Sequence, residues 1–220
     1  PFLIDPDTLI EEGLLERGEV ESLYWGNDPT SVDFEAVYRG REPLFRLACL
    51  RGWERDKEAF AVFRSANPWL EDYALFMALK RHFGMRAWTE WEDEDIRLHR
   101  ASALAEYNAK LREDVEFYIY LQFLFFKQWS KLKSYIHSLD IKIIGDLPIY
   151  VALDSADVWS EPHFFLLDEN NPHMMYDLLG WIKSQLISKF YIDATDECPK
   201  VKDLVALCEE VDAFLCYAYL

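Results

Sequence analysis

The densest group of chemically capable side chains in the sequence lies between residues 145 and 159. This stretch, GDLPIYVALDSADVW, contains three carboxylates together with tyrosine, serine and tryptophan. Carboxylates accept hydrogen bonds from sugar hydroxyls, and flat aromatic rings pack against the apolar faces of a pyranose. The mixture therefore favours a carbohydrate site, whose candidate residues are Asp146, Tyr150, Asp154, Ser155, Asp157 and Trp159. The alternative is an ordinary loop, with an Asx-turn at Asp146 and a capped turn at 154–157.

A second acidic group, IDATDE, occupies residues 192–197 and follows a short apolar run. Glycosyl transfer with retention of configuration needs two carboxyl groups about 5–5.5 Å apart, one as nucleophile and one as acid/base. Asp193 and Glu197 are candidates for these roles by residue type and location. The alternative is that these acidic residues only begin a helix at Lys200, where the helix dipole favours negative charge.

Other site classes lack their signatures in this sequence. There is no G-x-S-x-G, P-loop or G-x-G-x-x-G pattern, and no histidine or cysteine cluster at metal-ligand spacing, so no metal site is predicted. The four cysteines, Cys49, Cys198, Cys208 and Cys216, form no C-x-x-C pair. They are typical of buried free thiols in a reducing cytoplasm.

The net charge of the chain and the length of its apolar runs limit the kinds of partner that it can bind. The chain has 23 Lys and Arg against 40 Asp and Glu, which gives 23 − 40 = −17. Nucleic acids and anionic membrane surfaces would be repelled, so neither is predicted as a partner. The longest apolar run, at 117–126, is much shorter than the roughly 20 residues of a membrane span. The hydrophobic content of 51% indicates a globular core.

These residues must be positioned by the elements around them, and the first part of the chain predicts helices. Asp5 and Pro6 begin a short helix, and Asp33 caps another with a break at Gly40 and Pro43. Helical spacing then predicts helices at 57–66, ending before Asn67-Pro68, at 69–84, and at 93–138. The aromatic residues of 117–129 are expected in the core, because nearly all faces of that helix are apolar.

The pattern changes at residue 140. Short β-branched or apolar runs at 141–146, 163–167, 191–193 and 214–220 predict strands, with helices at 176–189 and 200–210 between them. This alternation indicates an α/β region, so we divide the chain into a mainly helical part, 1–139, and an α/β part, 140–220. After residue 138, 220 − 138 = 82 residues remain. A (β/α)₈ barrel typically needs about 250, so any barrel here is partial.

Three stretches resemble 4-α-glucanotransferases, also called amylomaltases or disproportionating enzymes, of glycoside hydrolase family 77. They are NPWLEDYALF at 67–76, the aromatic helix at 117–129, and 143–159. Residues 2–15 resemble the stretch after the second barrel strand of that family, and the resemblance is nearly continuous to residue 168. It implies a partial (β/α)₈ TIM barrel with a large helical insertion, in a chain that is incomplete at the front and shortened near its end.

The resemblance also implies a function. Family members transfer segments of α-1,4-glucans to glucose or to another glucan by double displacement, without a metal or organic cofactor. Asp146, Pro148 and Tyr150 match the first conserved region, at the third barrel strand. Its continuation would line or support the donor side of the cleft, through Asp154, Ser155, Asp157 and Trp159. A bacterial, cytoplasmic enzyme acting on maltooligosaccharides or α-1,4-glucan is therefore expected.

The match weakens after residue 168, where the catalytic motifs belong. Residues 191–194 keep only Ile-Asp of the family's Arg-Ile-Asp-His-Phe, and 194–201 resembles its Ala-Glu-Asp-Leu-Gly stretch with Thr195 at the Glu position. The two overlap, and the prediction is Asp193 as nucleophile and Glu197 as a displaced acid/base. Two alternatives stay open: an inactive glucan-binding or interaction module that stacks sugar on Tyr150 and Trp159, and a reading frame with no independent role.

Overall fold

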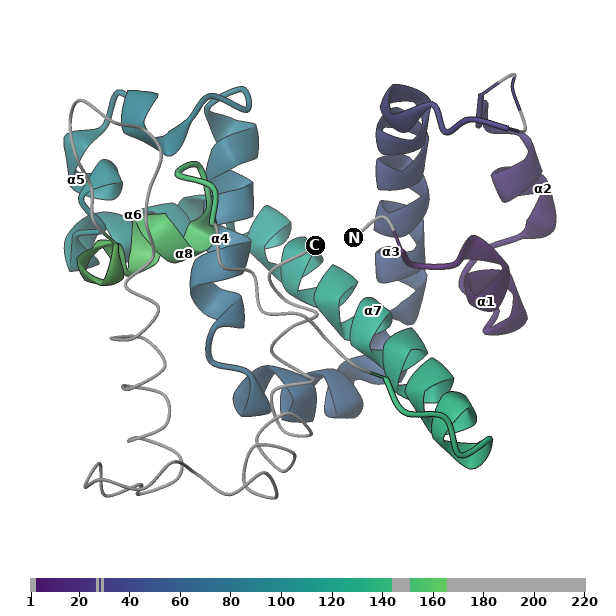
Figure 1. The fold of residues 1–220 in the computed structure, drawn as a ribbon. Coiled ribbons are helices and arrows are strands. Elements are labelled where there is room, and N and C mark those ends of the chain that lie inside the picture. The colour runs from purple at the N-terminus through teal and green to yellow at the C-terminus, as the bar shows by residue number, and fades with distance from the viewer. Residues whose placement is uncertain (1–2, 27, 29, 144–150, 166–220) are drawn as a thin grey trace, which may run out of the picture. The chain divides into compact units, whose positions relative to one another are not determined.

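The structure is a computed structural model that describes residues 3–26, 28, 30–143 and 151–165 (Figure 1). It divides into two compact units. The first consists of Pro1–Leu79 and Tyr107–Lys142, and the second of Lys80–Glu106 and Ile143–Leu220. Residues 80–106 thus group with the region after residue 142, although the sequence pattern makes them part of the helical stretch.

The first unit begins with two short capped helices, α1 (Pro6–Glu11) and α2 (Arg17–Glu21). The Asp5 carboxylate accepts hydrogen bonds from the backbone N–H groups of Asp7 and Thr8, both at 3.2 Å, and Pro6 stands in the first turn. The predicted start of this helix is confirmed. The cap works because it satisfies amides that have no partner inside the helix.

Helix α3 (Phe34–Ala66) is a single helix of 33 residues, capped by Asp33. The predicted break at Gly40 and Pro43 and the separate helix at 57–66 are therefore wrong. An internal proline costs a helix about 3 kcal/mol. Leu44 and Phe45 follow it directly and are buried, and burying such a side chain contributes about 1.5–3 kcal/mol each. Burial thus offsets the local penalty. The predicted end of the helix before Asn67 is confirmed.

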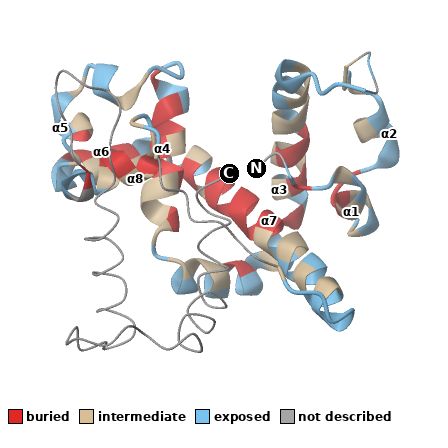
Figure 2. Ribbon diagram, viewed as in Figure 1, coloured by how far each residue is buried: buried red, intermediate tan, exposed pale blue. Residues whose placement is uncertain are grey.

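Helix α7 (Arg112–Ser138) supplies the largest share of the core of the first unit. Every residue of 117–125 is buried, which confirms the core prediction for this part of 117–129 and shows as the buried stretch of α7 in Figure 2. Phe126 and Trp129 are half-buried. Its rings pack against α3: Phe60 and Phe123 meet edge to face with centroids 5.9 Å apart, and Phe63 and Phe126 lie 5.5 Å apart. Such pairs stabilise beyond the area they bury.

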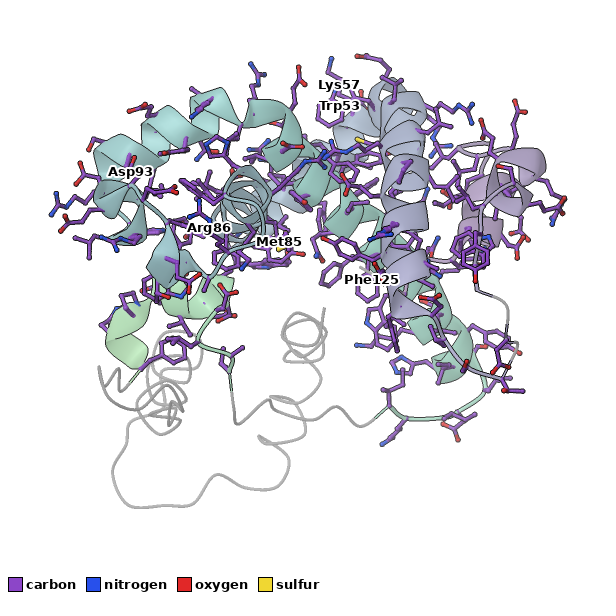
Figure 3. The ribbon with its side chains drawn as sticks, turned by 90° about the horizontal axis from the view of Figure 1, so that it is seen from above. Trp53, Lys57, Met85, Arg86, Asp93 and Phe125 are labelled. Carbon is purple, nitrogen blue, oxygen red and sulfur yellow. The ribbon has the colours of Figure 1, made fainter. Side chains whose placement is uncertain are left out.

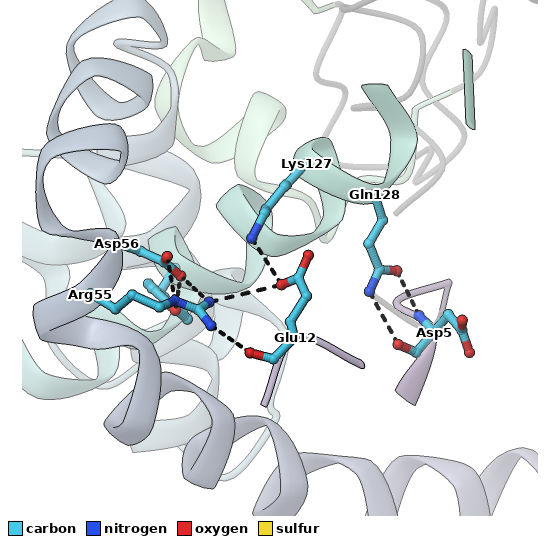
Figure 4. Close-up of polar contacts among 7 residues, drawn as sticks. Asp5, Glu12, Arg55, Asp56, Lys127 and Gln128 are labelled. Carbon is cyan, nitrogen blue, oxygen red and sulfur yellow. Dashed lines mark hydrogen bonds and ion pairs between the residues drawn. The ribbon is translucent and has the colours of Figure 1, made fainter. Parts of the chain in front are cut away.

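Polar contacts tie α1 to α3 and α7 (Figure 4). Arg55 of α3 donates a hydrogen bond to the backbone oxygen of Glu12 at 2.7 Å, and Lys127 of α7 pairs with the Glu12 carboxylate at 2.8 Å. Gln128 accepts from the backbone N–H of Asp5 at 2.8 Å and donates to its carbonyl oxygen at 3.1 Å. The first helix is thereby fixed to the two long ones.

The predicted helix at 69–84 is confirmed as α4 (Leu70–His82), which ends where Gly84 and Met85 take positive φ of 65° and 63°. Its last three residues belong to the second unit. The predicted continuous helix at 93–138 is wrong: α5 (Glu94–Arg97), α6 (Ala101–Lys110) and α7 replace it. The chain turns at His99, with φ 53°, and at this turn the carbonyl of Ile96 accepts hydrogen bonds from the His99 amide and the Trp159 indole.

The second unit also contains η1 (Trp88–Glu90), α8 (Ala156–Ser160) and η2 (Pro162–Phe164). A 3₁₀ turn at 162–164 replaces the predicted start of the strand at 163–167, while Phe165 is extended. Residues 144–150 and 166–220 lie outside the described residues, and so do most of the predicted strands. Within the residues described, the elements are helical, and none of the helices is long and apolar enough to span a membrane.

Candidate functional site

The described part of the candidate carbohydrate motif is the stretch 151–160, in the second unit. It contains Asp154, Ser155, Asp157 and Trp159. The remaining predicted site residues lie outside the described residues: Asp146, Tyr150, Asp193 and Glu197. The described part of the candidate site is therefore the second half of the motif, together with the residues of 80–99 that contact it.

Asp154 is held through both of its carboxylate oxygens. Lys80 Nζ donates to Oδ2 at 2.5 Å, and the backbone N–H of Trp88 donates to Oδ1 at 3.1 Å. The Asp154 side chain is still 38% exposed, so a carboxylate oxygen with several lone pairs has room for one more donor. The residue predicted to bind sugar is thus first of all an anchor for its own loop.

Lys80, which the sequence reasoning missed, is the cation at this anchor. It is 6% exposed, and its ammonium also donates to the carbonyl oxygens of Met85 at 3.1 Å and Arg86 at 2.7 Å. Figure 3 labels these last two residues where the chain turns after α4. With Asp154, the three acceptors match the three donors of an ammonium group. The desolvation that burial imposes on the charge is therefore compensated.

Ser155 begins α8 and places Asp157 in its first turn. The Ser155 hydroxyl accepts a hydrogen bond from the Val158 amide at 3.4 Å, as a helix cap does. Burial raises the pKa of the Asp157 carboxyl above its usual value, because the charged form loses hydration. A partly buried carboxylate of this kind gains from a hydroxyl donor supplied by a ligand.

Trp159 is not available for stacking on a sugar. Its side chain is 1% exposed, and the indole N–H donates to the backbone oxygen of Ile96 at 2.9 Å. Trp91 meets its ring with centroids 5.8 Å apart, and the His99 ring lies at 4.5 Å, both edge to face. The stacking role considered for Trp159 is therefore wrong. The residue supports the loop from inside the protein.

Trp88 is a second residue that the sequence reasoning missed. Its indole N–H donates to the backbone oxygen of Leu153 at 2.7 Å, while its amide binds Asp154. The ring packs with Val151 and Leu153 against the buried Val158 and Phe165. The stretch 151–160 is thus tied by Lys80 and Trp88 at one end and by the Trp159 indole at the other.

This arrangement presents carboxylates on a stretch whose backbone is fixed at both ends. Among the residues the structure describes, no three His, Cys, Asp or Glu side chains come together as a metal site. What the stretch can offer a ligand is hydrogen-bond acceptance by Asp154 and Asp157. Polyhydroxylated compounds match such acceptors.

Comparisons with known proteins agree with this chemistry. The sequence model of the family described as 4-alpha-glucanotransferase matches residues 1–180. The 4-alpha-glucanotransferase of Streptococcus pneumoniae is 44% identical over 169 residues, which are 76% of this chain and 34% of that protein. That of Thermus thermophilus is 42% identical over 175 residues, 77% of this chain and 34% of its own length. The chain thus spans about a third of the length of the curated relatives it matches.

A solved structure is similar as well. It is the amylomaltase from Streptococcus agalactiae in complex with acarbose, with a TM-score of 0.78 and 32% sequence identity. The similarity covers 86% of this chain and 43% of that one. The family resemblance predicted from the sequence is therefore confirmed by a sequence match and by a fold match. On this evidence the chain belongs to the 4-alpha-glucanotransferase family, family 77 of the glycoside hydrolases.

Proposed function

We propose that the chain serves the transfer of α-1,4-glucan segments to glucose or to another glucan. The observation that carries this proposal is the family match over residues 1–180, which includes the whole stretch 145–159. Relatives named 4-alpha-glucanotransferase and a similar amylomaltase solved with acarbose support the same substrate class. A neutral glucan needs no electrostatic steering, so the net charge of −17 is compatible with it.

Within this proposal, the glucan is bound by hydrogen bonds to Asp146, Asp154, Ser155 and Asp157 and by packing against Tyr150. The anchored backbone of 151–160 supports the roles of Asp154 and Asp157, because a binding group that is already fixed loses little entropy when the ligand arrives. Trp159 contributes indirectly, by holding α8 through Ile96. The stretch 140–220 would supply part of a (β/α)₈ barrel, and the cytoplasmic location and bacterial origin stay predictions.

The reaction proposed is a retaining double displacement. The Asp193 carboxylate attacks the anomeric carbon, the glycosidic bond breaks, and Glu197 gives its proton to the leaving oxygen. The 4-hydroxyl of the acceptor then attacks the same carbon and gives its proton back to Glu197, while Asp193 leaves. Both assignments rest on the sequence pattern of 191–201.

Incubation of the pure chain with maltotriose tests the activity. Glucose and longer maltooligosaccharides are the expected products, and Asp193→Asn abolishes their formation because the nucleophile is lost. Asp203→Asn, a carboxylate in the same part of the sequence with no assigned role, serves as the matched control and keeps the wild-type rate. If no products form, or if Asp193→Asn reacts as fast as wild type, the catalytic assignment fails.

One observation favours a second function, glucan binding without turnover. The family match ends at residue 180, whereas Asp193 and Glu197 lie beyond it. In that case the chain binds maltooligosaccharide but releases no glucose from maltotriose, and Tyr150→Ala weakens binding. Titration calorimetry beside the product assay separates the two functions.

A further inference from the structure

Lys80 is the buried charged side chain among the described residues, and the catalytic proposal gives it no part. It stands on α4, at the start of the second unit, and among the described residues its hydrogen bond to the candidate site is the one to Asp154. In the described structure its other acceptors are backbone carbonyls of the turn after α4. Lys80 therefore links that turn directly to the stretch 151–160.

We propose that Lys80 is a positioning residue for glucan binding, which acts through Asp154 to hold the stretch 151–160 in its binding conformation. The proposal rests on the glucan-binding function proposed above. Asp154 directly precedes Ser155, the cap of α8, and α8 carries Asp157. Fixing the carboxylate of Asp154 between Lys80 Nζ and the Trp88 amide therefore fixes where α8 begins.

The other end of the stretch 151–160 is anchored by Trp159, so the role of Lys80 is limited to the first end. Trp159 is held by its hydrogen bond to Ile96 and by two neighbouring rings, and none of these contacts depends on Lys80. Loss of Lys80 should therefore loosen 151–155, which then depend on the contacts of Trp88, while the end of α8 stays attached. The consequence is a looser binding segment in a unit that remains folded.

The consequence for affinity follows from populations. A ligand that binds only the anchored conformation has its dissociation constant divided by the fraction of molecules in that conformation, so the constant rises as this fraction falls. If removal of the ammonium reduces the anchored fraction to about a tenth, maltoheptaose binds about tenfold more weakly. Lys80→Met removes the charge and keeps most of the aliphatic side chain.

The test combines calorimetry with maltoheptaose and hydrogen exchange of the full chain. Lys80→Met is expected to bind about tenfold more weakly and to exchange faster in 151–155 and at the Trp88 amide. Asp154→Ala should weaken binding at least as much, because it also removes a proposed glucan contact. The double variant should bind no more weakly than Asp154→Ala alone, because both changes break one link. Lys127→Met, which breaks a comparable ion pair to Glu12 in the first unit, is the matched control with wild-type affinity.

The other possible results contradict either the role of Lys80 or the proposed glucan binding. Wild-type affinity of Lys80→Met, additive effects of Lys80→Met and Asp154→Ala, or an equal loss in Lys127→Met would show that Lys80 contributes only general stability. If the wild-type chain itself binds no maltoheptaose, the glucan-binding proposal fails, and unchanged exchange in 151–155 of Lys80→Met then refutes the anchor independently. Should Lys80→Met not fold, Lys80→Arg replaces it, and an affinity as low as that of Asp154→Ala contradicts the proposal.

Discussion

Gly52 of α3 is the point where the packing of the first unit allows the sharpest prediction. A Cβ added there would lie 1.9 Å from Tyr120 Oη, 3.1 Å from Tyr120 Cζ and 3.0 Å from Leu14 Cδ2. The Tyr120 ring cannot easily move away, because Phe60 and Phe123 hold it with centroids 5.8 and 5.6 Å away. We therefore expect Gly52→Ala to destabilise the protein, although alanine is the better helix former.

The magnitude follows from three contributions. Alanine in place of glycine in a helix contributes about 0.5–1 kcal/mol of stability. Overpacking a filled core costs about 1–3 kcal/mol. Displacing Tyr120 Oη also breaks its 2.8 Å hydrogen bond to Asp56, and a hydrogen bond to a charged group is worth about 1.5–3 kcal/mol. The sum is a net loss of about 1.5–5.5 kcal/mol.

Thermal unfolding followed by circular dichroism measures this loss. For a chain of this size, 1 kcal/mol corresponds to about 2–4 °C, so Gly52→Ala should lower Tm by at least about 3 °C. Gly40→Ala is the matched control in the same helix: its Cβ would meet no atom closer than 3.6 Å, at Leu23 Cδ1. The control should therefore be about 0.5–1 kcal/mol more stable than wild type.

The expected clash between a Cβ at position 52 and Tyr120 is refuted if Gly52→Ala is as stable as wild type. It is also refuted if the two alanine variants change stability in the same direction. A second comparison isolates the hydroxyl. In a Tyr120→Phe background the atom nearest to the new Cβ is absent, so Gly52→Ala should cost less than it does in the wild-type background. Equal costs in both backgrounds would show that Tyr120 Oη is not the obstacle.

Three further predictions concern charge and capping. Burial would raise the pKa of Asp56, but hydrogen bonds from Arg55 and Tyr120 outweigh it and lower this pKa. The contribution of Asp56 to stability is therefore present above its unfolded pKa and is lost as pH falls through its folded pKa. The difference in stability between wild type and Asp56→Asn, measured by urea unfolding, should accordingly shrink below about pH 4. Burial raises the pKa of Asp157, so the charge of this carboxylate destabilises the fold at neutral pH. Asp157→Asn should therefore raise Tm at pH 7, although it should weaken glucan binding. The gain in Tm should vanish at acid pH, where the Asp157 carboxyl is protonated. Ser155→Ala removes the cap of α8 and should cost about 0.5–2 kcal/mol by urea unfolding, whereas an unchanged midpoint would show that the cap is not used.

The sequence predicted best those elements that depend on neighbouring residues. The start of α1 at Asp5 and Pro6 and the end of α4 before Gly84 were predictable because caps and glycine act within one helical turn. The core role of 117–125 was predictable because a helix that is apolar on nearly all faces must be covered on several sides.

The predictions that failed depend on contacts between distant residues. Pro43 indicated a break in α3, but buried side chains that follow it keep the helix continuous. The helix at 93–138 is interrupted near His99, where Trp159, far along the chain, binds the carbonyl of Ile96. Local propensity contains no information on such partners. The resemblance to the family gave the function class, whereas it did not reveal which motif residues face inward.

Lys80 did leave a signal in the sequence. It follows Phe76 by four residues and Met77 by three, so helical spacing places it on the apolar face of α4. A lysine at such a position needs acceptors inside the protein, because burying an unpaired ammonium costs several kcal/mol. A carboxylate partner was therefore foreseeable, but its identity as Asp154 was not, since the two are separated by 74 residues.

The Lys80–Asp154 pair joins a buried ammonium to a carboxylate that is 38% exposed, and such a pair is weak evidence for stability. Replacing such a pair by well-packed hydrophobic residues is often neutral or stabilising by about 1–4 kcal/mol, because desolvation offsets the attraction between the charges. An apolar contact could therefore close this loop as well as the ion pair does. An ammonium with three acceptors and a carboxylate with two donors instead impose directions on every contact. Direction matters when α8 must present Asp157 at a fixed place, and an apolar contact would leave the stretch free to slide. The Lys80–Asp154 pair is accordingly better explained by the precision that the proposed glucan binding requires than by the stability of the fold.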